Sequence, residues 1–133
     1  MSGKTAWITG ASSGIGEGLA KEWLARGGRC VLSGRNVAAL EAVAAHAPDR
    51  CLVLPFESTD YAAIPALVEK AVAFAGNVDV LVNNAGISQR SLAVDTAFPV
   101  YQKIVDVDLL APIALTQALL PHMVARGSGQ LVM

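Results

Sequence analysis

Short apolar runs alternate along this chain with longer segments in which apolar residues recur at helical spacing. The short runs cover residues 6–9, 30–33, 51–54, 78–82 and 131–133, and Gly, Pro or Asn residues bound them. Runs of this length and composition predict strands that are buried on both faces of a sheet. The pattern therefore predicts five strands.

The segments between the runs predict helices, and the first two have clear ends. The first helix begins at Gly14 and stops at the Gly27-Gly28 pair, because glycine favours the left-handed conformation that ends many helices. Asn36 is placed to cap the second helix, which ends near Pro48 because proline cannot continue it.

The third and fourth helices each contain a proline. We predict that the regular part of the third helix begins near Pro65 and runs to Phe74. The fourth begins near Pro99, is kinked at Pro112 and ends before Gly127. Strands that alternate with helices predict a parallel sheet with right-handed crossovers, the doubly wound α/β class, in one domain.

Length, composition and charge narrow the class of protein. The chain has 133 residues, of which 53% are hydrophobic and 16% charged, with a net charge of −1. The absence of a basic run argues against a nucleic-acid surface or a polybasic membrane patch. Charge or glycine interrupts the apolar stretches within about ten residues, short of the roughly 20 that a membrane helix needs, so we expect no transmembrane segment. The N-terminus leads into a strand rather than a secretory signal, so the expected location is cytoplasmic.

Two cysteines, Cys30 and Cys51, each open an apolar run that predicts a strand. They form no metal-ligand cluster. We expect both to be buried free thiols, as unpaired cysteines in a reducing compartment usually are.

A glycine-rich turn between the first strand and the first helix carries the sharpest chemical signal. Residues 9–16 read Thr-Gly-Ala-Ser-Ser-Gly-Ile-Gly. Glycines there permit a tight turn and a close approach to a pyrophosphate, and the N–H groups at the start of a helix favour an anion. A glycine-rich turn can also serve close packing alone. Its position between a strand and a helix favours phosphate binding.

A second motif follows the fourth predicted strand. Residues 83–86 read Asn-Asn-Ala-Gly directly after the apolar run 78–82. Doubly wound sheets bind ligands beyond the carboxyl ends of their strands. Both motifs are therefore predicted to border one crevice.

With these two motifs the sequence resembles the short-chain dehydrogenase/reductase family, whose members carry T-G-x-x-x-G-x-G after the first strand and N-N-A-G after the fourth. The resemblance spans essentially the whole chain and implies a Rossmann fold. It implies that the turn holds a pyrophosphate and that the second motif lines the adenosine. The residues that match these roles are Gly10, Ser12, Ser13, Gly14, Ile15, Gly16, Asn84, Ala85 and Gly86.

The residues after the second strand predict the cofactor preference, and those after the third strand predict a contact to its adenine. Gly34 and Arg35 stand where an acidic residue would bind the ribose 2′-hydroxyl of NAD(H), so a guanidinium there favours NADP(H). The alternative is a solvated surface arginine. Glu57 and Ser58 replace the Asp and small apolar residue that relatives place against the adenine. Glu57 keeps the hydrogen-bond acceptor of the Asp on a longer side chain, so it can contact the adenine. The alternative interpretation is that Glu57 is a loop carboxylate without a role in binding.

The resemblance aligns Asp108 with the catalytic Asn of the family. In relatives this residue supports a water-linked proton relay, partly through its backbone carbonyl, which Asp108 also possesses. A buried carboxylate without partners would tend to protonate, so the substitution leaves the catalytic role open. Asp106 and Asp108 together do not predict a metal site, because residues two apart on a helix point in different directions.

The remaining catalytic residues of the family are not found. Relatives use a Ser beyond the fifth strand and a Tyr-x-x-x-Lys on the next helix, whereas Tyr61 is followed four residues later by Pro65 and Tyr101 by Val105. We therefore interpret the chain as the NADP(H)-binding N-terminal part of a longer, homo-oligomeric dehydrogenase that acts on a ketone or secondary alcohol. The alternative is a module that binds or senses NADP(H) without turnover.

Overall fold

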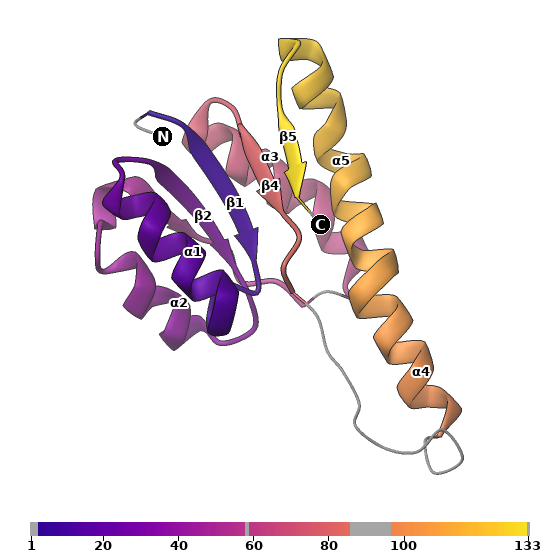
Figure 1. Ribbon diagram of the computed structural model, residues 1–133. Coiled ribbons are helices and arrows are strands. Elements are labelled where there is room, and N and C mark those ends of the chain that lie inside the picture. The colour runs from indigo at the N-terminus through magenta and orange to yellow at the C-terminus, as the bar shows by residue number, and fades with distance from the viewer. Residues whose placement is uncertain (1–2, 58, 86–96, 133) are drawn as a thin grey trace.

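The computed structural model describes residues 3–57, 59–85 and 97–132 and contains a parallel sheet (Figure 1). Its strands lie in the order β3-β2-β1-β4-β5. Their bounds are β1 Thr5–Thr9, β2 Arg29–Ser33, β3 Cys51–Val53, β4 Val80–Val82 and β5 Gln130–Val132. Every pair of neighbouring strands is parallel, which confirms the doubly wound α/β class.

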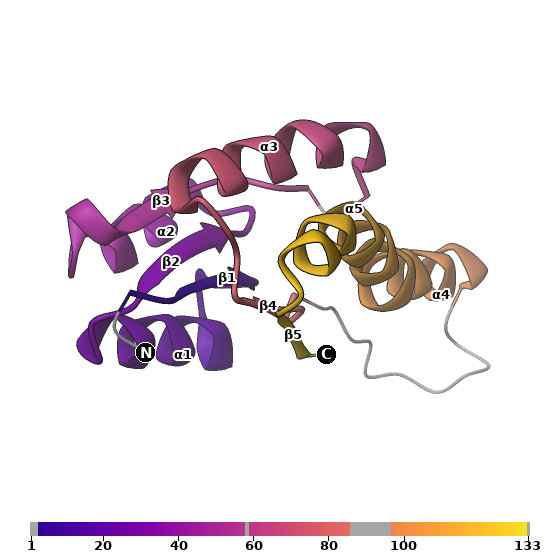
Figure 2. The ribbon, with the colours of Figure 1, turned by 90° about the horizontal axis from the view of Figure 1, so that it is seen from above.

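Helices cover both faces of this sheet, and Figure 2 shows α1 and α3 on opposite sides of the strands. Apolar residues of α1 and α2 pack with Ala6 and Ile8 on one face, and those of α3 and α5 pack with Trp7 on the other. Successive strand residues point to opposite faces, so β1 is buried along its whole length, with apolar residues at its three central positions and a threonine at each end. The helix bounds are α1 Gly14–Ala25, α2 Val37–Ala44, α3 Ile64–Ala75, α4 Phe98–Val105 and α5 Ala111–Arg126.

Two of the predicted helix starts are confirmed by their contacts. The side chain of Asn36 accepts a hydrogen bond of 3.1 Å from the backbone N–H of Ala39 and so caps α2. Pro65 lies in the first turn of α3, where its missing N–H has no intrahelical partner to lose. A short 3-10 helix, Tyr61–Ala63, leads into α3.

The predicted kink at Pro112 takes a different form. A π-helical turn, Asp106–Leu110, joins α4 to α5, so the three segments run as one long helix in Figure 1. Pro112 has no N–H to donate to the carbonyl of residue 108, and the N–H of Ala111 donates to the carbonyl of Asp106, five residues back. The proline is accommodated by a wider turn immediately before it.

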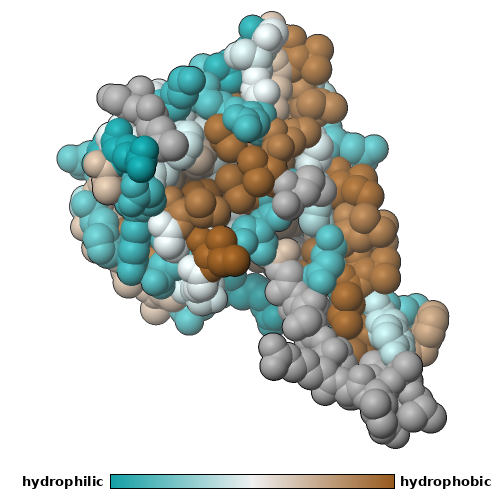
Figure 3. All heavy atoms as spheres, viewed as in Figure 1, coloured by the Kyte–Doolittle hydropathy of each residue, from teal (hydrophilic) through white to brown (hydrophobic). Residues whose placement is uncertain are grey.

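The expectation that no segment is long and apolar enough to cross a membrane is corrected by this helix. Residues Phe98–Arg126 have a mean hydropathy of 1.5 over their most apolar stretch, and 28% of that stretch is buried. Figure 3 shows apolar side chains along α4 and α5. Length and composition alone are weak support for a membrane span. In this fold Leu115, Leu119 and Met123 of the same helix pack against the sheet and α3.

The two cysteines lie side by side in the β2–β3 register as free thiols, but only one is buried as predicted. Cys30 is fully buried, whereas Cys51, on the edge strand, is half-buried. Burial raises the pKa of the Cys30 thiol to about 12, with a smaller contribution from Cys51, and burial also raises the pKa of Cys51. Both thiols are therefore protonated at neutral pH, a state that disfavours nucleophilic or redox chemistry.

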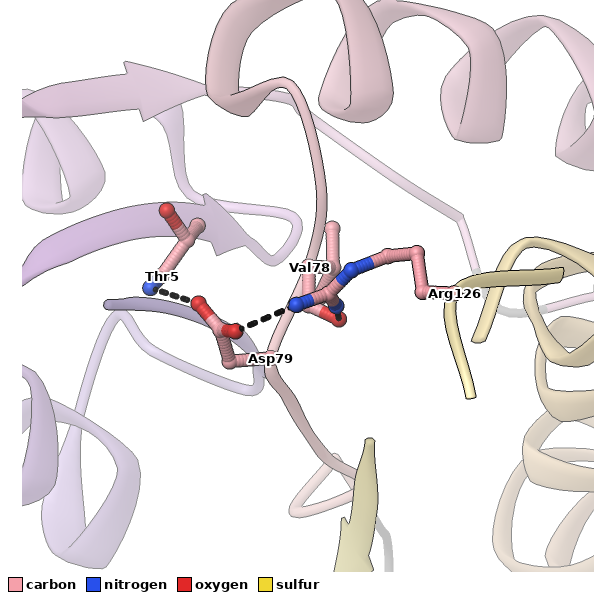
Figure 4. A network of polar contacts seen from close by, with 4 residues as sticks. All are labelled: Thr5, Val78, Asp79 and Arg126. Carbon is pink, nitrogen blue, oxygen red and sulfur yellow. Dashed lines mark hydrogen bonds and ion pairs between the residues drawn. The ribbon is translucent and has the colours of Figure 1, made fainter. Parts of the chain in front are cut away.

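A polar network at the amino ends of the strands fixes α5 against the sheet (Figure 4). Asp79 accepts a hydrogen bond of 2.8 Å from the backbone N–H of Thr5 and forms an ion pair of 2.9 Å with Arg126. Arg126 also donates to the carbonyl of Val78. The two charged side chains are only 27% and 19% exposed, so water screens their attraction incompletely.

We expect Asp79→Ala to lower the free energy of unfolding by about 1.5–3 kcal/mol, because it leaves a guanidinium and a backbone N–H without their carboxylate. Glu22→Ala is the control, since it removes the acid from the exposed Glu22–Arg26 pair on α1 and should change stability by less than about 0.5 kcal/mol. Chemical denaturation of the three proteins measures the difference. Equal effects of the two variants would contradict a structural role for the network.

Candidate functional site

A cleft of about 250 Å³ lies at the carboxyl edge of the sheet, opposite the Asp79 network. The ends of β1, β2, β3 and β4 contribute to its walls, as the crevice rule for doubly wound sheets predicts. Its lining residues are Thr9, Gly10, Ser12, Ser13, Ser33, Gly34, Arg35, Phe56, Glu57, Asn84, Ala85 and Val107.

The glycine-rich turn packs against the second motif without space for side chains at two positions. Gly10 has a φ of +64°, and a Cβ atom there would lie 2.9 Å from the Cα atom of Ala85. A Cβ atom at Gly16 would overlap the carbonyl oxygen of Gly10 and lie 2.6 Å from the amide nitrogen of the Asn84 side chain. Glycine is therefore required at both positions for the turn to lie this close to its neighbour.

Thr9 joins the two motifs through its hydroxyl group. This oxygen accepts hydrogen bonds of 3.0 Å from the backbone N–H groups of Asn84 and Ala85, and it donates to the carbonyl of Val82 at 3.3 Å. The side chain of Asn84 donates to the carbonyl of Gly10 at 3.4 Å. Sequence reasoning did not assign Thr9 to the site, although it opens the glycine-rich motif.

The predicted phosphate-binding residues separate into two groups. Gly10, Ser12 and Ser13 line the cleft, and Ser13 is also the N-cap residue of α1. Gly14, Ile15 and Gly16 form the first turn of α1 outside the lining. Ile15 is 76% exposed, which is unusual for a large apolar side chain beside a cleft.

The residue predicted to select the cofactor, Arg35, and the residue predicted to contact its adenine, Glu57, both line the cleft. The Nε atom of Arg35 lies 3.1 Å from Oε2 of Glu57 in an ion pair, and the side chains are 66% and 46% exposed. Ser33, whose hydroxyl accepts from the indole of Trp7 at 2.8 Å, also lines the cleft. Sequence reasoning had treated Arg35 and Glu57 as two separate cofactor contacts.

Other predicted site residues lie away from this arrangement. Asp108 is exposed on the π-helical turn and does not line the cleft. Its carboxylate is therefore not buried, and the protonation expected of a buried carboxylate does not apply. Its neighbour Val107 is buried and lines the wall of the cleft. Ser58 and Gly86 lie outside the described residues. Among the residues that are described, no three His, Cys, Asp or Glu side chains gather as a metal site.

Comparison with known proteins gives a consistent result. Residues 4–133 match the family model for short chain dehydrogenase. The chain is 41% identical to "Dehydrogenase/reductase SDR family member 7" of Homo sapiens over 95% of this chain and 39% of that protein. It is 42% identical to member 7B of Rattus norvegicus over 94% of this chain and 41% of that protein. The chain thus spans about two-fifths of the length of these relatives.

Solved structures show the same likeness. A short-chain dehydrogenase from Streptomyces avermitilis superposes with a TM-score of 0.92 at 36% identity, over 98% of this chain and 48% of that one. A metagenomic short-chain oxidoreductase in complex with NADP gives a TM-score of 0.91 at 32% identity, over 98% of this chain and 61% of that one.

Proposed function

Because the chain belongs to the short-chain dehydrogenase family, we propose that its cleft binds NADP(H) and that the protein transfers hydride between this cofactor and a ketone or secondary alcohol. The observation that carries the proposal is the convergence of three features on one cleft: the glycine-rich turn, the Asn84-Ala85 segment and Arg35. The NADP complex of one related structure supports the choice of cofactor.

The residues present fit a dinucleotide. Gly10, Ser12 and Ser13 offer backbone and hydroxyl donors beside the start of α1, where an anion is favoured, and we assign them to the pyrophosphate. We assign Asn84 and Ala85 to the adenosine. The cleft volume of about 250 Å³ lies just below the roughly 300–1,000 Å³ that is typical of small-molecule sites.

Arg35 is the residue that we assign to the 2′-phosphate of NADP(H). It stands at the carboxyl end of β2, and no acidic residue occupies the positions that follow this strand before α2. A guanidinium presents a planar fork of donors that matches a phosphate. We assign Glu57 to the adenine end; Ser58 and Gly86 remain sequence-based proposals.

Chemistry at the substrate requires a proton donor as well as the nicotinamide, which supplies the hydride when the cofactor is bound. Neither Tyr61 nor Tyr101 is followed four residues later by a lysine. We therefore assign the proton transfer to neither tyrosine. Asp108 is retained as a candidate for the supporting relay, because its π-helical turn borders the cleft through Val107. A cytoplasmic location and a homo-oligomeric state stay predictions.

Titration with the two cofactors tests this proposal. An arginine–phosphate contact contributes about 1.5–3 kcal/mol, so NADPH should bind roughly 10- to 100-fold more tightly than NADH. Fluorescence of the buried Trp7, whose indole contacts Ser33 in the cleft wall, provides the signal. Equal affinities would contradict the assignment of Arg35.

A second measurement, on the protein as its gene encodes it, distinguishes the dehydrogenase from the alternative, a module that binds NADP(H) without turnover. Ketone-dependent oxidation of NADPH supports the dehydrogenase. Tight binding of NADPH without oxidation for a panel of ketones would instead favour a binding or sensing module.

A further inference from the structure

The ion pair between Arg35 and Glu57 is part of the lining of the cleft. The two residues follow the neighbouring strands β2 and β3, and the hydrogen bond from the N–H of Phe56 to the carbonyl of Gly34, at 3.0 Å, holds these strand ends together. The hydroxyl of Thr59 donates to the second carboxylate oxygen of Glu57 at 3.4 Å. Glu57 is therefore held beside the one side chain that we assign to the 2′-phosphate.

The Glu57 carboxylate opposes the binding of a 2′-phosphate to the Arg35 guanidinium, because both anions would contact the same cation. The phosphate would carry roughly −1.5 to −2 charges at neutral pH, so it would meet like charge on Glu57 as well as opposite charge on Arg35. Both side chains are substantially exposed, so water and salt weaken this repulsion without removing it. NADH has no phosphate at this position and does not experience the repulsion.

We propose that Glu57 determines the degree of cofactor preference: by competing with the 2′-phosphate for Arg35, it weakens the binding of NADP(H) relative to that of NAD(H). The inference rests on the proposed function, since it concerns the same cleft. The inference predicts the direction in which NADPH affinity changes when the Glu57 carboxylate is removed. A glutamate that merely oriented Arg35 toward the phosphate would strengthen NADPH binding, so its removal would have the opposite effect.

Glu57→Gln tests the inference, because it removes the charge and keeps the size and the acceptor oxygen. In the protein as its gene encodes it, the variant should bind NADPH about 3- to 10-fold more tightly and NADH within about twofold of wild type. Raising NaCl from about 50 mM to about 500 mM should shrink the gain, since salt screens exposed charges. Isothermal titration calorimetry with NADPH and NADH gives the four dissociation constants at each salt concentration.

Asp49→Asn is the matched control. It makes the same change of charge on an exposed residue of the Pro48–Arg50 turn, which precedes β3 at the other end of that strand. We expect this variant to bind both cofactors as wild type does. A gain in NADPH affinity equal to that of Glu57→Gln would reduce the effect to net charge and overturn the inference.

Each remaining outcome is decisive. Weaker binding of NADPH by Glu57→Gln, with an unchanged melting temperature, would show that Glu57 orients Arg35 and would overturn the inference. The inference would also be overturned if wild type prefers NADPH and Glu57→Gln shows the same ratio of NADPH to NADH affinity. In that case the proposed function would stand. Failure of wild type to bind either cofactor would overturn the proposed function and this inference together.

Discussion

Replacing Arg35 by aspartate is expected to reverse the cofactor preference of this protein. The variant loses the guanidinium that we assign to the 2′-phosphate and places a carboxylate beside it, so NADPH should bind at least about 100-fold more weakly. NADH should bind as well as before or better, because a carboxylate after the second strand accepts a hydrogen bond from the ribose 2′-hydroxyl. The exposure of Arg35 leaves the fold little affected.

The reversal is measured by titrating both cofactors into wild type and variant. Arg26→Asp is the control, since it makes the same change of net charge on an exposed arginine just beyond the last turn of α1, away from the cleft lining. This control should keep the wild-type preference for NADPH. Should Arg35→Asp retain that preference, Arg35 would be a surface arginine and the 2′-phosphate would bind elsewhere.

The strands were predictable because a parallel sheet between two helical layers buries both faces of each strand, which leaves a continuous apolar run in the sequence. The same fact explains where the predicted bounds are wrong. The run 78–82 begins two residues before β4, and the run 51–54 ends one residue after β3. Val78 and Leu54 lie outside the strands, but both are buried in the core. An apolar run therefore indicates which residues are buried and not where a strand begins or ends.

The fourth helix shows a second limit. A proline inside a helical pattern indicates a disturbed hydrogen-bond ladder, and Pro112 does mark one. Whether the chain responds with a kink or with a π-helical turn depends on what the flanking segments pack against. Here Val107, inside the π-helical turn, and Ala111, directly after it, are both buried, and one continuous helical path keeps both there.

The position of the site was predictable and its internal contacts were not. Motifs that follow the first and fourth strands must lie at one edge of a doubly wound sheet, so the crevice follows from topology. The Arg35–Glu57 ion pair depends on the directions of two side chains that follow neighbouring strands. The sequence does not reveal these directions, so each residue was assigned separately from the family position that it matches. Thr9 was missed for a similar reason, because its hydroxyl acts only on backbone groups of the distant Asn84-Ala85 segment.

Gly16→Ala is expected to damage both the fold and cofactor binding. The added methyl group would overlap the carbonyl of Gly10 and crowd the side chain of Asn84, so the glycine-rich turn must move away from the second motif. Overpacking of this kind costs about 1–3 kcal/mol of stability. Because Gly10 lines the cleft, the same displacement should weaken the binding of NADPH by at least about tenfold.

Gly18→Ala is the control for this variant, since it makes the same substitution two residues further along α1. A Cβ atom at Gly18 meets nothing within 4 Å, and alanine favours a helix over glycine by about 1 kcal/mol. The two substitutions should therefore shift the melting temperature in opposite directions, and only Gly16→Ala should lower the affinity for NADPH. Thermal unfolding and cofactor titration of both variants measure this. If Gly16→Ala were stabilised and bound NADPH as wild type does, the turn would have room to yield, and close packing of the two motifs would not be what shapes the cleft.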